Sequence, residues 1–359
     1  MLLLFASPSY GNDYTALLAA ARERTRAGIV LGCSASGFLA GPHESEDQPG
    51  LALMALWLPG ATLAPLRLHQ EHLDLLDDPG SWPGLDARVA GEITSWLVFA
   101  EPYRFDTQAF LRKLQHAFPG TGIMGGLASG MVSERRSCVF FDDHWYDEGA
   151  IALGFGAPYR LVPHVSQGCA PIGETWTITG TDRNVLLSIS NRPALQVLQE
   201  TVDTLSGDLR QVAQRNLVVG LAGSEYRDDF QRGDFAIRGI LGIDQSKGSV
   251  AIGGLPRVGQ TLQFHLRHAA SAHDDLEAML ARAVSIPTGA DPVAAVLCTC
   301  DGRGQSLFGE PNHDAGVTSA ALGAIPLAGA FCIGEIGPLG GQVSLHGFTA
   351  TLGILLRTE

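Results

Sequence analysis

Several residue patterns are missing from this chain of 359 residues, and each absence excludes a class of protein. No run of lysines or arginines forms a basic segment, and the net charge is -13, so nucleic acid is not an expected partner. The six cysteines include no CxxC pair, and the eleven histidines include no HxH or HxxxH pair. The sequence therefore predicts neither a disulfide framework nor a metal site.

Signals for export or membrane insertion are also missing. The chain begins MLLLFASPSYG, where no basic residue precedes a short apolar run, so we expect no signal peptide and a cytoplasmic location. Residues 315–334 carry no charge, but they include Pro326 and four glycines. This segment fits a buried helix followed by a buried strand better than a membrane span.

The composition is that of a folded protein. Hydrophobic residues make up 45% of the chain and charged residues 17%, which excludes an intrinsically disordered chain. A chain of this length exceeds one ordinary core, so two domains are expected.

The first half of the chain contains an internal repeat. LLLFASPSYG aligns with WLVFAEPYRF, which pairs Phe5 with Phe99, and GCSASG aligns with GGLASG, which pairs Ser36 with Ser129. Self-similarity over about thirty-five residues indicates a duplicated structural unit. Each unit has the pattern strand, helix, strand and glycine loop, with helices predicted over 14–25 and 107–117.

The end of the chain repeats the same order. Residues 294–297 predict a leading strand, 315–322 a helix, 326–333 the next strand, and GEIGPLGG a third glycine loop. A strand-rich stretch lies between, with helices over 193–205 and 271–284. We predict a mixed α/β (α+β) fold of two related domains, 1–157 and 158–359, with mixed sheets covered by helices and duplicated units facing each other across glycine loops.

The segment CTCDGRGQSLFGEPNHDA carries most of the side chains capable of chemistry. Cys300 follows a buried strand and is either a small buried hydrophobe or a nucleophile with His313 as its base. Arg303 lies between two glycines and is either solvated or bound to a ligand carboxylate. Asn312 and Asp314 precede a helix and are either helix caps or ligand contacts.

Glu335 is the most informative single residue. It follows an apolar strand and is flanked by glycines, where a carboxylate is costly to bury unless it is paired. Its partner is either a structural arginine, such as Arg303 or Arg192, or the ammonium group of a ligand. An arginine and a carboxylate are the minimum needed to hold a zwitterion. Ser36 and Ser129 can offer hydroxyl groups to the same ligand.

The chain resembles the FIST family, a two-part module of bacterial signalling proteins and of a eukaryotic F-box protein. The resemblance is carried by RGDFAIRGILGID, CDGRGQSLFGEPNHDA and AGAFCIGEIGPLGG in the C-terminal half, and by GCSASG, GGLASG and NRPALQVL before them. It implies a sensory module rather than an enzyme, with a small-molecule ligand such as an amino acid, no resident cofactor, and a separate signalling protein as partner.

The resemblance also implies which residues form the ligand cleft. The matching positions are Cys300, Arg303, Asn312, His313, Asp314 and Glu335. Asp301 stands where relatives are expected to have asparagine, which removes an uncharged hydrogen-bonding group. Two alternatives stay open: a thiol-dependent enzyme that uses Cys300, and a haem-binding nitric oxide sensor.

Overall fold

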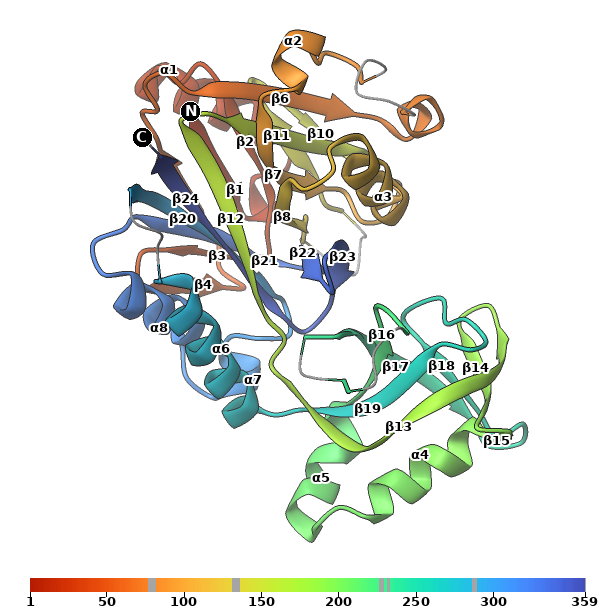
Figure 1. Cartoon of the computed structure of the whole chain (residues 1–359). Coiled ribbons are helices and arrows are strands. Elements are labelled where there is room, and N and C mark those ends of the chain that lie inside the picture. Colours follow the sequence, from red (N-terminus) through yellow and green to blue (C-terminus); the bar gives the residue numbers. More distant parts are fainter. Residues whose placement is uncertain (77–81, 131–135, 226–228, 231–232, 286–288, 359) are drawn as a thin grey trace.

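The computed structural model describes residues 1–76, 82–130, 136–225, 229–230, 233–285 and 289–358. Figure 1 shows a body that contains both ends of the chain and a lobe formed by its middle part. The body consists of three sheets and the helices beside them. This arrangement confirms the predicted class, a mixed α+β fold with mixed sheets.

The first sheet is built on the first repeat, and its strand order is β10-β9-β2-β1-β5. Strands β1 and β2 are parallel, and every residue in them is buried, as expected for parallel strands covered on both faces. The elements of this layer are β1 (Leu2–Ala6), η1 (Pro8–Asp13), α1 (Tyr14–Thr25), β2 (Val30–Ser34), β5 (Leu51–Ala55), β9 (Val139–Phe141) and β10 (His144–Tyr146).

The second sheet is built on the second repeat, and its order is β23-β22-β8-β7-β11-β6. Again the two central strands, β7 and β8, are parallel. The elements of this layer are β6 (Thr62–Leu68), η2 (Gln70–Leu75), α2 (Ala87–Ala90), β7 (Ile93–Ala100), α3 (Thr107–Ala117), β8 (Gly122–Leu127), β11 (Ala150–Gly156), β22 (Glu335–Leu339) and β23 (Gln342–His346).

The third sheet is built on the end of the chain, and its order is β12-β24-β20-β21-β3-β4. Strands β20 and β21 form its parallel pair. The elements of this layer are β3 (Gly37–Ala40), β4 (His43–Glu46), β12 (Tyr159–Ser166), β20 (Ala290–Cys300), α7 (Gln305–Phe308), α8 (His313–Leu322), β21 (Leu327–Cys332) and β24 (Ala350–Thr358).

Each repeat sends the hairpin after its second strand into a different sheet. The β3–β4 hairpin of the first repeat joins the third sheet, β9–β10 of the second repeat joins the first, and β22–β23 of the third repeat joins the second. The three repeats are thus linked in a closed cycle. Because strands from both sides of residue 157 share sheets, the boundary between 1–157 and 158–359 stays a prediction.

The same exchange corrects one expectation from the sequence. GEIGPLGG does not form a third glycine loop but most of the β22–β23 hairpin. Counting from the strand register, the residues equivalent to Ser36 and Gly37 are Ile333 and Gly334. The glycines of this segment favour a loop and its apolar residues favour a strand. The segment forms a strand because β22 pairs with β8.

One glycine in each repeat allows the parallel strands to pack closely. A Cβ atom on Gly32, Gly125 or Gly329 would lie 1.7, 1.7 or 1.8 Å from a carbonyl oxygen of the neighbouring strand. Such an approach is closed to any other residue. One position further on, Phe5 and Phe99 meet edge to face at a centroid distance of 5.3 Å in the core shared by the three sheets.

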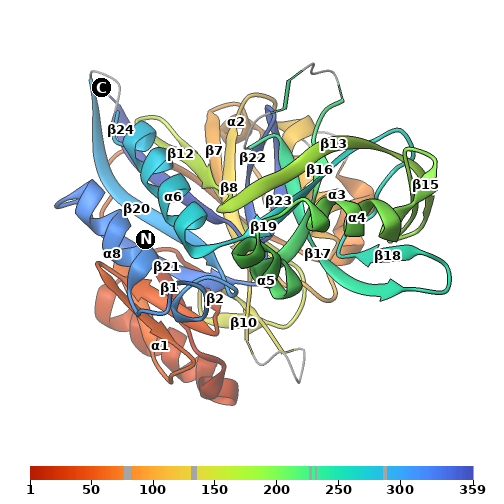
Figure 2. The same cartoon turned by 90° about the horizontal axis from the view of Figure 1, so that it is seen from below.

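The lobe is an antiparallel sheet whose strand order closes on itself, because β13 pairs with β14 as well as with β19, and two helices lie on one side of it (Figure 1). Figure 2 shows it beside the body, and its strand order is β13-β19-β16-β17-β18-β14-β15. Helix α6 follows the lobe and packs against α8 and β12 of the body. The elements are β13 (Cys169–Asp182), β14 (Val185–Ile189), β15 (Arg192–Pro193), α4 (Ala194–Asp203), α5 (Gly207–Asn216), β16 (Leu217–Ala222), β17 (Phe235–Asp244), β18 (Ser249–Ile252), β19 (Thr261–Arg267) and α6 (Ala269–Ala283).

The predicted helices over 14–25 and 107–117 coincide with α1 and α3. The uncharged segment 315–334 is a helix followed by a buried strand, as predicted. Among the residues described, no helix is long and apolar enough to cross a membrane. Helix α5 was not predicted from the sequence, because it is mostly polar and buries only Ala213.

Candidate functional site

The glycine loops of the first half meet the C-terminal motifs in one cluster. The backbone N–H of Ser36 donates to Ser129 Oγ at 2.8 Å, and Ser129 Oγ donates to the carbonyl of Phe331 at 2.6 Å. Ser36 Oγ donates to Asp301 Oδ1 at 2.7 Å. All three repeats therefore contribute to this junction, since the parallel strands of each repeat end there.

Asp301 is the acidic residue of this junction. Burial raises the pKa of its carboxyl group, and the hydroxyl groups of Ser36 and Ser129 act in the opposite direction. The serines thus stabilise the ionised form of a side chain that water reaches poorly. Ser36 and Ser129 hold Asp301 in place, and the prediction that they also contact a ligand is not tested by this geometry.

Arg303 and Asp314 form a fully buried ion pair. Arg303 Nε and Nη2 donate to the two carboxylate oxygens of Asp314 at 2.6 and 2.8 Å, and Thr299 Oγ1 donates to the same carboxylate at 2.6 Å. Burial alone would raise the pKa of Asp314, but the charge and hydrogen bonds of Arg303 hold it well below its usual range. The carboxylate that faces Arg303 therefore belongs to this chain.

His313 and Asn312 tie helix α8 to its surroundings. The His313 ring stacks on Phe308 at 3.4 Å and bonds His273 at 3.0 Å and Asp314 at 3.1 Å. Asn312 has a left-handed backbone with φ of 65°, and its side chain accepts a hydrogen bond from the backbone N–H of Glu44 instead of capping the helix.

Glu44 supplies the cap that Asn312 does not. Its Oε1 accepts from the backbone N–H of Ala315 at 2.7 Å, in the first turn of α8. Burial raises the pKa of Glu44 to about 7, and the bond to Ala315 works against this shift. Sequence reasoning missed Glu44, because it comes from the exchanged strand β4, far away along the chain.

Glu335 is fully buried, and the structure gives it a partner on only one side. Thr349 donates to Oε2 through its hydroxyl group at 2.6 Å and its backbone N–H at 3.1 Å. Among the described residues, Oε1 has no hydrogen-bond partner. Burial raises the pKa of Glu335 to about 8, against the opposing effect of Thr349. At neutral pH this carboxyl group is mostly protonated.

Cys300 lies beside Glu335 and is buried. Burial and the charge of Glu335 raise the pKa of its thiol far above the ordinary value. A nucleophilic cysteine needs the opposite shift, and His313, the base expected from the sequence, bonds Asp314 and His273 instead. The environment therefore gives no support to the thiol enzyme alternative.

Two residues that the sequence did not single out lie against the loop 300–303. Arg267, at the end of β19, packs on Gly302: a Cβ atom there would be 2.7 Å from Arg267 Nη1. Its guanidinium carbon lies 5.4 Å from the centre of the Phe348 ring. Phe348 has φ of 62°, which is unusual for a bulky residue and typical of functional sites. No local pattern marks either residue in the sequence.

Comparison with known proteins gives the class of the protein. The FIST N domain model matches residues 1–192, and the FIST C domain model matches residues 194–338. The chain therefore belongs to the FIST family, whose domains are associated with sensory proteins of signal transduction.

Full-length relatives occur in mycobacteria. An uncharacterized protein of Mycobacterium tuberculosis (strain ATCC 25618 / H37Rv) is 35% identical over 99% of this chain and 91% of its own length. An uncharacterized protein of Mycobacterium bovis (strain ATCC BAA-935 / AF2122/97) is 34% identical over 99% of this chain and 90% of its own. Both alignments extend over nearly the whole of this chain.

Proposed function

We propose that this protein is a cytoplasmic sensor that binds an amino acid or a related zwitterionic metabolite at the loop 300–303 and passes the signal to a separate protein. The observation that carries the proposal is a set of three buried polar atoms around this loop. Arg267 Nε, Arg303 Nη1 and Glu335 Oε1 have no hydrogen-bond partner among the described residues. Buried polar atoms without partners are rare, and a ligand is one way to satisfy them.

The chemistry of these three atoms complements a zwitterion. The guanidinium N–H groups of Arg267 and Arg303 suit a carboxylate, and Glu335 suits an ammonium group. Asp314 already occupies two donors of Arg303, so Arg267 takes the main role that the sequence analysis gave to Arg303. Cys300 lies beside Glu335 and contributes a small, uncharged wall.

The position of the site suits a sensor. Arg267 belongs to the lobe, whereas Glu335 and Arg303 belong to the body. A ligand held between them stabilises one orientation of the lobe, and this is the change that a signalling partner would detect. If the lobe instead packs against the body without any ligand, no metabolite should change the mobility of the lobe.

Binding should release a proton. Glu335 has a pKa of about 8 without ligand, so it is mostly protonated at pH 7. An ammonium group placed beside it lowers this pKa and drives the proton off. Titration calorimetry at pH 7 in two buffers of different ionisation enthalpy should therefore report the release of nearly one proton for each ligand bound.

The direct test is a thermal-shift screen of amino acids and related metabolites. A ligand at a hundred times its dissociation constant stabilises the fold by about 2.7 kcal/mol, which is visible as a higher melting temperature. The shift should be lost in Arg267→Ala and kept in Arg257→Ala, a control that removes an exposed lobe arginine paired with Glu225. The absence of any shift across the screen would refute the proposal.

A further inference from the structure

Strand β5 leaves one edge of the first sheet open. It is the last strand of this sheet, and among the described residues it pairs only with β1. Met1 and Leu56 exchange two backbone hydrogen bonds, at 2.8 and 2.9 Å, so every second residue along β5 bonds towards β1. The backbone groups of the residues in between, Leu51, Leu53 and Ala55, therefore point away from β1, where another strand can pair with them.

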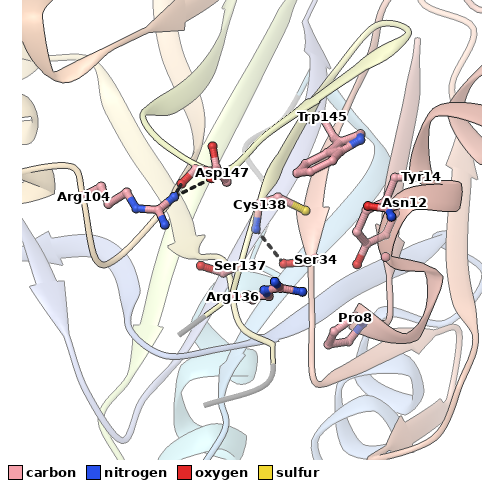
Figure 3. Close-up of a pocket in the computed structure, with 11 residues that line it drawn as sticks. Pro8, Asn12, Tyr14, Ser34, Arg104, Arg136, Ser137, Cys138, Trp145 and Asp147 are labelled. Atoms are coloured by element: carbon pink, nitrogen blue, oxygen red, sulfur yellow. Dashed lines mark hydrogen bonds and ion pairs between the residues drawn. The ribbon is translucent and has the colours of Figure 1, made fainter. Parts of the chain in front are cut away.

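The other edges of the three sheets in the body are protected against such pairing. At the opposite edge of the first sheet, Trp145 of β10 packs on Tyr14 of α1, with 6.1 Å between the ring centres (Figure 3). Strands β6 and β12 contain Pro65 and Pro163, β4 carries two glutamates, and β23 lies against α3. Proline, charge and covering elements keep strand edges from associating. Strand β5 contains neither a proline nor a charge.

The sequence around β5 is free of charge over a long stretch. Residues 48–66 include no Asp, Glu, Lys or Arg, although these residues make up 17% of the chain. Two of the apolar side chains in this stretch face solvent, since Leu53 is 43% exposed and Trp57 is 87% exposed. Tryptophan is highly buried on average, and it is enriched among the residues that contribute most to protein interfaces. An uncharged open edge beside an exposed tryptophan therefore has the character of an interface.

A second copy of this chain fits this edge, because an antiparallel strand pair can have a two-fold axis. An axis at Leu53 places this residue opposite its own copy, and it places Leu51 opposite Ala55. All three have outward backbone groups, so each N–H meets a carbonyl of the other copy. In the same register Trp57 lies opposite Pro49 of the second copy, which is also exposed, so the two apolar groups cover each other.

The charge of the chain also favours this edge for self-association. Each copy has a net charge of -13, so two copies repel each other over most of their surface. Like charges that face each other across an interface are costly. An interface between two copies therefore requires a segment without acidic residues, and residues 48–66 form such a segment.

We infer that the protein forms a two-fold symmetric dimer in which β5 pairs with β5 of a second copy, so that the two first sheets become one continuous sheet. The inference does not depend on the ligand proposed for the loop 300–303. One strand pair with a tryptophan on each side is a small interface, and small interfaces are weak and reversible. The dimer should therefore dissociate on dilution.

Analytical ultracentrifugation of the full chain over a range of concentrations tests for the dimer. The average mass should rise with concentration from that of one chain towards twice that value. Leu53→Lys places two like charges opposite each other on the axis, so it should weaken dimerisation at least about tenfold. Leu75→Lys is the matched control, because Leu75 is 64% exposed and lies in η2, and it should leave dimerisation unchanged.

Cysteine cross-linking tests the register of the strand pair. Leu53→Cys brings two thiols face to face on the axis, within the reach of a disulfide, so oxidised glutathione should link the two chains. Residue 57 is more exposed, but its two copies would lie about 27 Å apart along the paired strands, so Trp57→Cys should stay unlinked. The six native cysteines are buried and should not contribute links.

Three results would overturn the inference. The first is the mass of a single chain at every concentration, and the second is equal dimerisation of the wild type and Leu53→Lys. The third is linkage of Trp57→Cys as fast as that of Leu53→Cys, which would indicate an apolar contact without strand pairing. None of these measurements involves a metabolite or Arg267, so this inference and the proposed function fail separately.

Discussion

Replacing Asp314 by asparagine tests the buried ion pair directly. The side chains of Arg303 and Asp314 are both 0% exposed, so the substitution would leave the guanidinium buried with no opposing charge. Removing one partner of a buried pair costs about 3–5 kcal/mol. Asparagine has nearly the shape of aspartate, so little of this loss comes from a cavity. Urea unfolding followed by tryptophan fluorescence should show a lower midpoint with an unchanged slope.

Two comparisons make the measurement of Asp314→Asn specific. Asp86→Asn, which removes an exposed partner of Arg88, should cost less than about 1 kcal/mol. The double variant Asp314→Asn with Arg303→Met should recover much of the loss, because no isolated charge remains. If the free energy of unfolding of Asp314→Asn lies within about 1 kcal/mol of the wild-type value, the ion pair does not contribute to stability as argued here.

The ion pair between Arg303 and Asp314 should also make the stability of the fold depend on pH. The pKa of Asp314 is lower in the folded chain than in the unfolded one, so its contribution is complete above the unfolded value of about 4. The contribution is lost as the pH falls from there through the lower folded-state pKa, because protonation removes the charge that faces Arg303. The difference in the free energy of unfolding between the wild type and Asp314→Asn should therefore become smaller at acidic pH.

The remaining predictions concern three other buried positions. The pKa of Glu335 is raised to about 8, so stability should fall as the pH rises from about 4 to 8, and Glu335→Gln should flatten this decline in melting curves. Gly329→Ala should prevent folding or cost more than about 3 kcal/mol, because its Cβ would overlap the carbonyl of Leu297, whereas Gly28→Ala meets nothing and should be tolerated in the same urea assay. Iodoacetamide should label Cys300 slowly in the folded chain and at an ordinary rate in urea; fast labelling of the folded chain would contradict its burial.

The repeat could be predicted from the sequence because each of its units is one continuous stretch of the chain. Phe5 and Phe99 were aligned by residue type, and the strand register places them at equivalent positions. The close approach of neighbouring strands requires glycine in GCSASG and GGLASG, so this packing can be recognised from the residue types alone. Buried parallel strands and capped helices are likewise encoded within a few residues of each other.

Partners that come from another sheet could not be predicted. Nothing near Glu44 in the sequence indicates that it caps α8, and nothing near Arg267 indicates that it packs on Gly302. The sequence also left open whether Arg303 meets a ligand or a structural carboxylate. The sequence predicts that its partner Asp314 is either a helix cap or a ligand contact, since sequence spacing does not show which way two side chains on different elements point.

The exchange of hairpins has a consequence for how the chain is made. On the ribosome, residues 37–40 are synthesised long before residues 327–332, which form the strand they pair with. The first sheet likewise waits for residues 139–146. A nascent or truncated chain therefore exposes unpaired strand edges, which are prone to aggregate. We expect the body to be completed only after residues 327–332 have been made, and chaperones to be needed for a good yield.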